Sequence, residues 1–526
     1  MLYKQGKHST RELLGLPDEI IEAMLSHMSA HSIVSCSQTC KRLYRIVAGS
    51  SHLQLILELA VEGLRLRRYP SRCMPCGMDT KSAAERLVQF RRWKEAWIRQ
   101  KPSRRLTLDI PIKISVVKDG LYACLVFGRS PKDTIEIYSL WMEEGQRDLN
   151  LWKRHELDIR VDAFSLDPSE NLLMLVQSCT DSVSENHDEY MLRVHLRTLN
   201  TALPHPNARM VILGQECIPF RHHYHISSWG DIIATLLQGY GSGMLFVWNW
   251  KTGEELYRCS NSYGYAYLSP SSIMVCVSKS SREALAGNFI ELLDIHDSSH
   301  GLVTLQLPII GSFPSVEVFS QAISGDSPNL CDDIPISPYI QDETAERLVI
   351  ITSHSSSGLH FFLLVRPLLR LLAKRKQTSS SSEPKPNLLS WDEWKQGTAY
   401  STDSEHLAVG CISIWGACAG FVYFRDLRSE DESLSTVEVP LVEDNERVEA
   451  TGLFLDFNPR PVTRDLSRAM PTECDDTLGP RRLAESLSRE LFFNGILPDK
   501  LRCFTVNSEV DYLFMMSDGG HVVLSK

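Results

Sequence analysis

The chain has 526 residues, of which 43% are hydrophobic and 23% are charged, so it is long enough for more than one globular domain. Its formal net charge of -10 argues against a nucleic-acid-binding surface as its main function, because phosphate contacts need an excess of Lys and Arg on one face. The 14 cysteines are scattered, which excludes the dense framework of a small disulfide-bonded module and indicates a reducing compartment. We therefore expect the protein in the cytoplasm, the nucleus or both.

The first predicted elements are three short helices between residues 13 and 59. Pro17 suits the first turn of a helix, where a missing N–H costs little, and Asp18 and Glu19 place negative charge at the positive end of the helix dipole. Apolar residues then recur at the spacing of an amphipathic helix. Ser32 is the expected N-cap of the second helix. Because so small a unit cannot bury all its apolar surface alone, part of that surface should face a partner.

This segment resembles the F-box family in the order and spacing of Leu16-Pro17-Asp18-Glu19-Ile20, Leu25, Ile33, Cys36, Cys40-Lys41-Arg42-Leu43-Tyr44 and Val47. In that family the leading Leu-Pro and the following apolar positions bind a Skp-type adaptor, which joins the protein to a cullin-RING ubiquitin ligase. The resemblance implies an F-box helical domain at residues 10–62. It also implies that the adaptor-binding residues are Leu16, Pro17, Ile20, Ile21, Leu25 and Ile33. An ordinary three-helix cap, packed on the rest of the protein, is the alternative interpretation of the same periodicity.

A connector is expected at residues 63–105. Ser82-Ala83-Ala84-Glu85 fits a capping box, and the bulky apolar residues that follow predict a helix over residues 81–100 that sets the orientation of the two domains. This layout also resembles large families of fungal F-box proteins. Cys73 and Cys76 form a C-x-x-C pair, but no second ligand pair follows at a zinc-site spacing, so we interpret the pair as part of a loop.

From residue 106 onward, short apolar runs alternate with clusters of Gly, Ser, Asp, Asn and Pro, which is typical of an all-β architecture. Residues 246–253 resemble the strand and turn of WD-repeat proteins, with Trp248-Asn249 where Trp-Asp is usual. We therefore predict an α+β multidomain chain in which residues 106–526 form a large, mainly-β domain, a degenerate β-propeller of about seven blades. A sandwich or a solenoid is the alternative. The expected strands are residues 121–128, 135–140, 171–176, 191–196, 232–236, 244–250, 273–277, 290–295, 348–352, 360–365, 421–426, 512–516 and 521–524.

Three insertions in this region are expected to be mobile. Residues 374–386 are basic and then Ser-rich, and residues 429–446 are acidic, and both have the low hydrophobicity of disordered segments. Residues 459–500 are long and mixed, with a candidate helix at 482–493.

The sequence contains little that suggests catalysis. His222-His223-Tyr224-His225 places two histidines on one face of a strand, but no further metal ligands accompany them, so we interpret them as a surface or hydrogen-bonded cluster. No P-loop, nucleophile elbow or zinc-protease motif is present. We predict no catalytic residue, no metal and no cofactor.

The resemblance implies a non-catalytic substrate-recognition subunit of a Skp-cullin-F-box ubiquitin ligase. The expected partners are the adaptor, the cullin-RING ligase beyond it and a target protein that binds the β-rich domain at unknown residues. We expect no nucleic acid partner and no membrane partner, since charged residues and a proline interrupt the most apolar stretch, residues 359–372. The alternatives are a scaffold that binds the adaptor without promoting degradation, and an enzyme built on a propeller.

Overall fold

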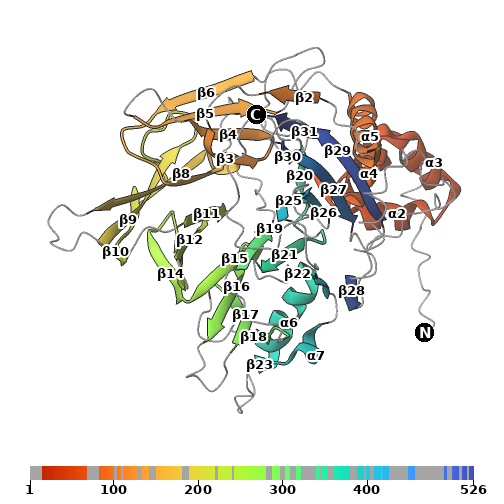
Figure 1. Cartoon of the computed structure of the whole chain (residues 1–526). Helices are drawn as coiled ribbons and strands as arrows, with labels where there is room; N and C mark the ends of the chain where they lie inside the picture. The colour runs from red at the N-terminus through yellow and green to blue at the C-terminus, as the bar shows by residue number, and fades with distance from the viewer. Residues whose placement is uncertain are drawn as a thin grey trace, which may run out of the picture.

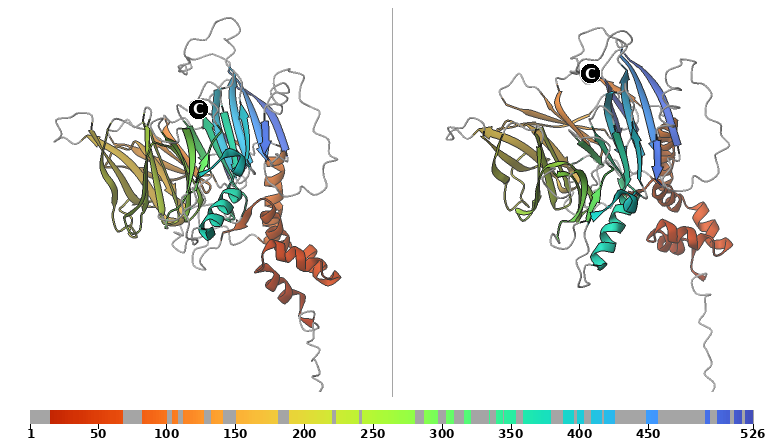
Figure 2. Two further views of the ribbon diagram at one scale, coloured as in Figure 1. Left: turned by 90° about the horizontal axis from the view of Figure 1, so that it is seen from below. Right: turned by 60° about the horizontal axis from the view of Figure 1, so that its bottom comes forward.

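The computed structural model describes residues 15–67, residues 82–99 and most of residues 104–525, with gaps at loops of which the longest are 426–447 and 457–490. It contains a small helical module, a connecting helix and a large ring of β-sheets (Figure 1). The helical module projects from one side of the ring (Figure 2). The predicted order, a small helical domain followed by a large mainly-β domain, is confirmed.

The helical module consists of α1 (Asp18–Ser26), α2 (Ala30–Ser37), α3 (Lys41–Gly49) and α4 (Ser51–Val61). One side of each helix faces a common core, because the apolar residues of each helix recur at helical spacing. The buried side chains of this core are Ile21, Leu25, Ile33, Leu43, Ile46, Val47 and Leu53.

Serine side chains cap the N-termini of two of these helices. Ser29 caps α2, because the backbone N–H of Ser32 donates to Ser29 Oγ at 3.2 Å; the prediction of Ser32 as the N-cap was wrong by three residues. Ser50 caps α4 by accepting a hydrogen bond from the backbone N–H of Leu53 at 3.2 Å. The Ser50 hydroxyl also donates to Glu22 at 2.5 Å, so the cap of α4 is tied to α1.

The connector contains a short strand, β1 (Leu64–Leu66), and the helix α5 (Ala83–Arg99). A capping box begins α5. The backbone N–H of Glu85 donates to Ser82 Oγ at 3.3 Å, and the Glu85 carboxylate accepts from the backbone N–H of Ser82 at 2.6 Å. Cys73 and Cys76 lie outside the described residues.

The first four sheets of the ring follow the chain in order, and we call them blades 1 to 4. Blade 1 contains β3 (Ile112–Lys118), β4 (Leu121–Val126), β5 (Thr134–Ser139) and β6 (Asn150–Glu156). Blade 2 contains β7 (Ala163–Asp167), β8 (Leu172–Thr180), β9 (Glu189–Thr198) and β10 (Ile212–Pro219). Blade 3 contains β11 (His223–Trp229), β12 (Ile232–Gly239), β13 (Ser242–Asn249) and β14 (Glu254–Ser260). Blade 4 contains β15 (Ser262–Ser269), β16 (Ser272–Lys279), β17 (Gly287–Asp294), β18 (Val303–Gln306) and the short parallel strand β23 (Leu388–Leu389).

Three more sheets complete the ring among the described residues. Blade 5 contains β19 (Val316–Ser320), β21 (Leu348–Ser353), β22 (Leu359–Leu364), β24 (Thr398–Thr402) and β28 (Leu491–Asn494). Blade 6 contains β25 (Ala408–Trp415), β26 (Cys418–Arg425), β27 (Val448–Asp456) and β29 (Lys500–Ser508). Blade 7 contains β30 (Tyr512–Ser517), β31 (Gly520–Ser525) and, parallel to β31, the early strand β2 (Arg104–Thr107).

The ring closes through contacts between neighbouring blades, and no sheet in the described part of the chain closes on itself. The first strand of each later blade contacts the blade before it, and β30 of blade 7 contacts β3 of blade 1. Blade 7 combines the last two strands of the chain with β2, so both ends of the β-rich region lie in one sheet. This is the propeller-like arrangement of about seven blades that the sequence predicts.

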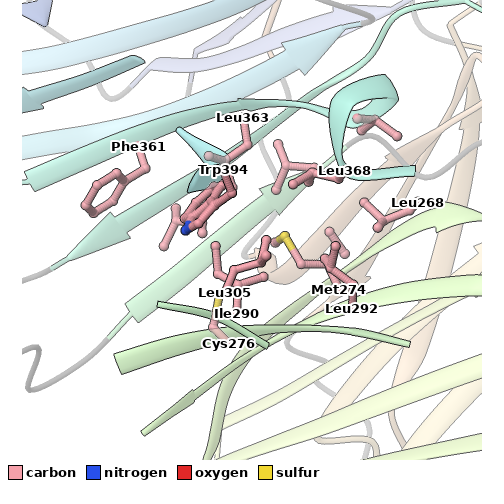
Figure 3. Close-up of a cluster of buried hydrophobic side chains, with 14 of the residues drawn as sticks. Leu268, Met274, Cys276, Ile290, Leu292, Leu305, Phe361, Leu363, Leu368 and Trp394 are labelled. Atoms are coloured by element: carbon pink, nitrogen blue, oxygen red, sulfur yellow. The ribbon is translucent and has the colours of Figure 1, made fainter. Parts of the chain in front are cut away.

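An extensive hydrophobic cluster lies between blades 4 and 5 and is covered by α6 (Val365–Thr378) and α7 (Trp391–Trp394) (Figure 3). Leu368 of α6 and Trp394 of α7 are buried in it. The indole N–H of Trp394 donates to the backbone carbonyl of Gln306 at 2.9 Å, which satisfies the polar atom of a buried Trp.

Each strand expected from the sequence overlaps an observed strand, but two expectations for the insertions were wrong. Residues 374–378 are the end of α6, not part of a loop, because the apolar side of this helix is held against blades 4 and 5. Residues 491–494 form β28, not the end of a helix, because they pair with β24. The remaining residues of the insertion near 374–386, all of 429–446 and most of 459–500 lie outside the described residues.

Candidate functional site

The structure separates the residues predicted to bind the adaptor into buried and accessible ones. Ile21, Leu25 and Ile33 are buried, with 2%, 4% and 0% of their surface exposed, and they form part of the core of the helical module. These side chains stabilise the helices and are not at the surface of the free chain. Leu16 is half-buried against the same core.

The other two predicted residues, Pro17 and Ile20, are exposed at the start of α1. Ile20, Met24 and Met28 follow one another at one-turn intervals and are 49%, 48% and 38% exposed. Tyr44 of α3 is 63% exposed. We call the large exposed apolar side chains between residues 17 and 44 the exposed apolar set: Pro17, Ile20, Met24, Met28, Val34 and Tyr44.

A row of exposed apolar side chains such as Ile20, Met24 and Met28 is typical of an interaction surface. Met24 on α1 and Met28 just after it continue the amphipathic spacing, but the sequence alone did not mark them as site residues. Periodicity shows which residues share a side of a helix, and it does not show which side the neighbouring helices cover.

Arg42 on α3 holds the start of this site in place. Its guanidinium donates to the backbone carbonyl of Leu16 at 2.7 Å, and to the Asp18 carboxylate at 2.5 and 2.9 Å. Two donors on one rigid, planar group fix both position and direction. Arg42 therefore orders the Leu16-Pro17 segment, which precedes α1 and lacks the hydrogen bonds of a helix interior.

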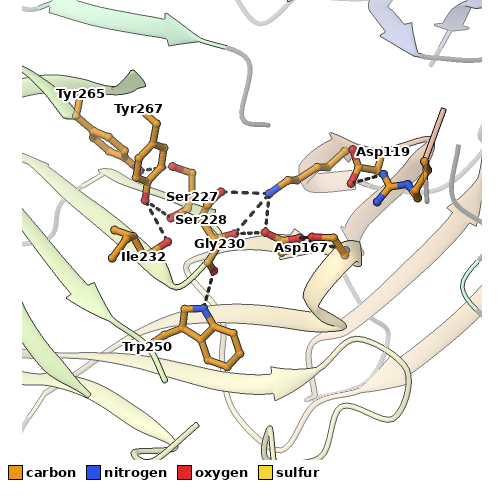
Figure 4. A network of polar contacts seen from close by, with 12 residues as sticks. Asp119, Asp167, Ser227, Ser228, Gly230, Ile232, Trp250, Tyr265 and Tyr267 are labelled. Atoms are coloured by element: carbon orange, nitrogen blue, oxygen red, sulfur yellow. Dashed lines mark hydrogen bonds and ion pairs between the residues drawn. The ribbon is translucent and has the colours of Figure 1, made fainter. Parts of the chain in front are cut away.

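A second group of polar residues joins blades 1, 2 and 3 in the interior of the ring (Figure 4). Lys118 Nζ lies 3.3 Å from Asp167 Oδ2 and 3.3 Å from the carbonyl oxygen of Ser228. Asp167 also accepts hydrogen bonds from the hydroxyls of Ser169 at 2.5 Å and Ser228 at 3.0 Å. Burial alone would raise the pKa of Asp167, but Lys118 and the two hydroxyls hold it below its ordinary value. Because these groups bind one another across three blades, we assign them a structural role.

Two histidines of the segment 222–225 lie on β11, the strand that also carries Ser228. His223 and His225 are both exposed, and His225 Nδ1 lies 3.1 Å from the hydroxyl oxygen of Tyr265. The Tyr265 hydroxyl donates in turn to the carbonyl oxygen of Ala234 at 2.9 Å. His222 lies outside the described residues.

The described part of the chain contains neither a metal-binding group nor a membrane-spanning helix. No group of three or more His, Cys, Asp and Glu side chains there is arranged to hold a metal ion. None of the described helices combines the length and the apolar character needed to cross a membrane.

Comparison with known proteins identifies the helical module. Residues 13–53 match the F-box-like family, so the chain carries an F-box-like domain that spans α1 to α3 and the start of α4. No curated protein matches the chain.

The chain is similar to several solved structures at low sequence identity. One is an uncharacterized protein from Listeria monocytogenes, with 7% identity and a TM-score of 0.27 over 50% of this chain and 64% of that one, so this chain spans under two thirds of its length. Another is the β-propeller domain of the Trilobed protease from Pyrococcus furiosus, with 10% identity and a TM-score of 0.30 over 65% of this chain and 91% of that one. A third is the WD40 domain of SCAP from fission yeast, with 8% identity and a TM-score of 0.32 over 79% of this chain and 91% of that one.

Proposed function

Because residues 13–53 are an F-box-like domain, we propose that this chain is the substrate-recognition subunit of a Skp-cullin-F-box ubiquitin ligase. A Skp-type adaptor binds the helical module, and a target protein binds the β-rich domain. The chain itself is non-catalytic, since the cullin-RING part of the complex transfers ubiquitin. The family match is the observation that carries the proposal, and the exposed apolar set supplies the surface for it.

The direct adaptor contacts in this proposal are Leu16, Pro17 and Ile20, together with Met24, which continues the exposed side of α1. The three buried members of the predicted set hold these residues in place from the core. Full burial of a large aliphatic side chain contributes 1.5–3 kcal/mol, so covering the exposed half of Ile20 contributes about 1 kcal/mol.

The proposed compartment is the cytoplasm or the nucleus. The cysteines whose side chains the structure describes are free thiols. Four of them are half-buried and would be open to oxidation outside the cell, namely Cys36, Cys40, Cys179 and Cys259. The net charge of -10 favours a protein target over a nucleic acid.

Co-purification of the full chain with a Skp-type adaptor tests the first step. The intact protein is expected to bind the adaptor, and Ile20→Glu/Met24→Glu is expected to abolish binding without unfolding the module, because both side chains are about half exposed. Val88→Glu is the matched control, since Val88 is 48% exposed on α5, outside the F-box-like domain, and this variant should bind normally. An intact chain that does not bind the adaptor refutes the proposal.

A reconstituted ubiquitination assay tests the second step. Proteins captured by the β-rich domain are expected to be ubiquitinated when the full chain, the adaptor and the cullin-RING ligase are combined. If the adaptor binds and ubiquitination of the captured proteins is unchanged, the chain is a scaffold and its role as a substrate receptor is wrong.

A further inference from the structure

The connection between the helical module and the ring is made of paired strands, a shared core and an ion pair, and we propose that it is a rigid lock. The lock would hold the F-box-like domain and the blades as one body, so that the adaptor-binding surface and the target-binding domain keep one relative orientation. This role deepens the proposed ligase function, but the contacts that support it belong to the free chain.

The first component is strand pairing. β1 of the connector pairs antiparallel with β20 (Tyr339–Gln341). In the sequence, β20 lies between β19 and β21, which are two strands of blade 5. The register joins Leu66 to Tyr339, and the backbone N–H of Asp342 donates to the carbonyl oxygen of Gly63 at 2.8 Å just beyond the pair. The connector therefore shares backbone hydrogen bonds with the β-rich domain, which a flexible tether would not.

The second component is a small hydrophobic core shared by three parts of the chain. It consists of side chains from α4, β1, α5 and β20, namely Leu55, Leu59, Leu64, Leu87, Phe90 and Tyr339. Phe90 is only 1% exposed, and its ring centroid lies 5.6 Å from that of Tyr339. Because α4 belongs to the helical module and β20 to the β-rich domain, any rotation between them would expose this core to water.

A glycine at the end of α4 permits the close approach of these parts. Gly63 has a φ of +74°, in the left-handed region that other residues rarely adopt. A Cβ atom added to Gly63 would lie 2.9 Å from the Cβ of Ala345, which follows β20. The connector backbone at Gly63 therefore lies directly against the Ala345 side chain, at a position where a larger residue does not fit.

The third component extends the lock from blade 5 to the first blades of the ring. Arg67, directly after β1, pairs with Asp119 in the turn between β3 and β4 of blade 1 at 3.4 Å, and the two side chains are 1% and 12% exposed. Ile334, which precedes β20, is buried in the cluster formed by blades 1 and 2, where it is 1% exposed. The connector and the segment that carries β20 therefore contact blades 1 and 2 as well as blade 5.

The helix α5 forms a second connection between the helical module and the ring. It packs on α4 and also contacts β31 of blade 7, and it leads to β2, which pairs with β31. The connector is therefore attached to the ring near its start, at β1, and near its end, at α5 and β2, so a hinge at either attachment alone would not free the module.

Distance measurement by pulsed electron spin resonance tests the lock in the full chain without the adaptor. Spin labels are introduced as unnatural amino acids at two exposed positions, Arg45 on α3 and Glu254 on β14, so that the native cysteines stay unlabelled. The intact protein is expected to give one narrow distance distribution. Phe90→Ala and Gly63→Ala are expected to broaden it, because the first empties the shared core and the second forces the two backbones apart.

Gly230→Ala is the matched control for Gly63→Ala. Gly230 also has a positive φ, +58°, but an added Cβ there meets nothing within 4 Å, so this variant should keep the narrow distribution. A broad distribution in the intact protein, or a narrow one in folded Phe90→Ala, overturns the lock. If Phe90→Ala does not fold, Gly63→Ala against Gly230→Ala decides. Because no adaptor is present, failure of the lock is distinct from failure of the proposed function, which the co-purification tests.

Discussion

Removal of the Asp167 carboxylate should destabilise the ring strongly. Asp167 is fully buried at the end of β7 and binds Lys118, Ser169 and Ser228. Asp167→Ala leaves the Lys118 ammonium, whose side chain is 6% exposed, with the carbonyl and hydroxyl oxygens of Ser228 at 3.3 and 3.4 Å as its remaining contacts from this group. Removing one partner of a buried ion pair costs about 3–5 kcal/mol, because the other charge stays buried without compensation.

The double variant Lys118→Met/Asp167→Ala separates charge compensation from packing. It removes both charges, so its loss of stability should be smaller than the sum of the two single losses by about 1–3 kcal/mol. Asp158→Ala is the matched control. Asp158 likewise pairs with a basic side chain, that of Arg197 at 2.6 Å, but the Asp158 side chain is 71% exposed, so its removal should cost under about 1 kcal/mol.

The assay is amide hydrogen exchange of peptides from β7 and β11 in the full chain, because a chain with several domains does not unfold in one step and local opening free energies are then the defined quantity. Both strands should open more easily in Asp167→Ala. A change under about 1 kcal/mol, or additive losses in the double variant, would refute the reasoning that this buried pair is coupled across the blades.

Three further predictions concern other sites. Burial lowers the pKa of His195 to about 4, whereas an unfolded histidine titrates near 6.5, so stability should fall as the pH drops from about 6.5 to 4, and denaturation of His195→Gln should show a weaker pH dependence in this window. Arg42→Ala removes the bond to the Leu16 carbonyl, so binding of the adaptor in titration calorimetry should weaken while the helical circular dichroism is kept, and unchanged binding would contradict the role of Arg42. Trp394→Ala should destabilise blades 4 and 5 by about 3–5 kcal/mol in hydrogen exchange, and Trp394→Phe by less, since it keeps most of the buried ring and loses the bond to Gln306.

Local sequence patterns were sufficient for the central strands of the blades. The expected strands are mostly the second and third of their blades, such as β8 and β12, whose side chains are buried on both faces and therefore form continuous apolar runs. The outer strand β14 was missed because its sequence, Glu-Glu-Leu-Tyr-Arg-Cys-Ser, is largely polar and exposed. It is a strand because its backbone pairs with β13, which no local pattern records.

The F-box-like domain was also readable from the sequence, because its Leu-Pro start and helical apolar spacing are local features of one short segment. Which apolar residues of that domain reach the surface was decided only by tertiary packing: Ile20 and Ile21 are neighbours in the chain, yet one is 49% exposed and the other 2%. Tertiary packing likewise determines the structure of the connector. β1 has three residues and pairs with β20, far away in the chain, so its structure depends on a partner that its own sequence does not specify.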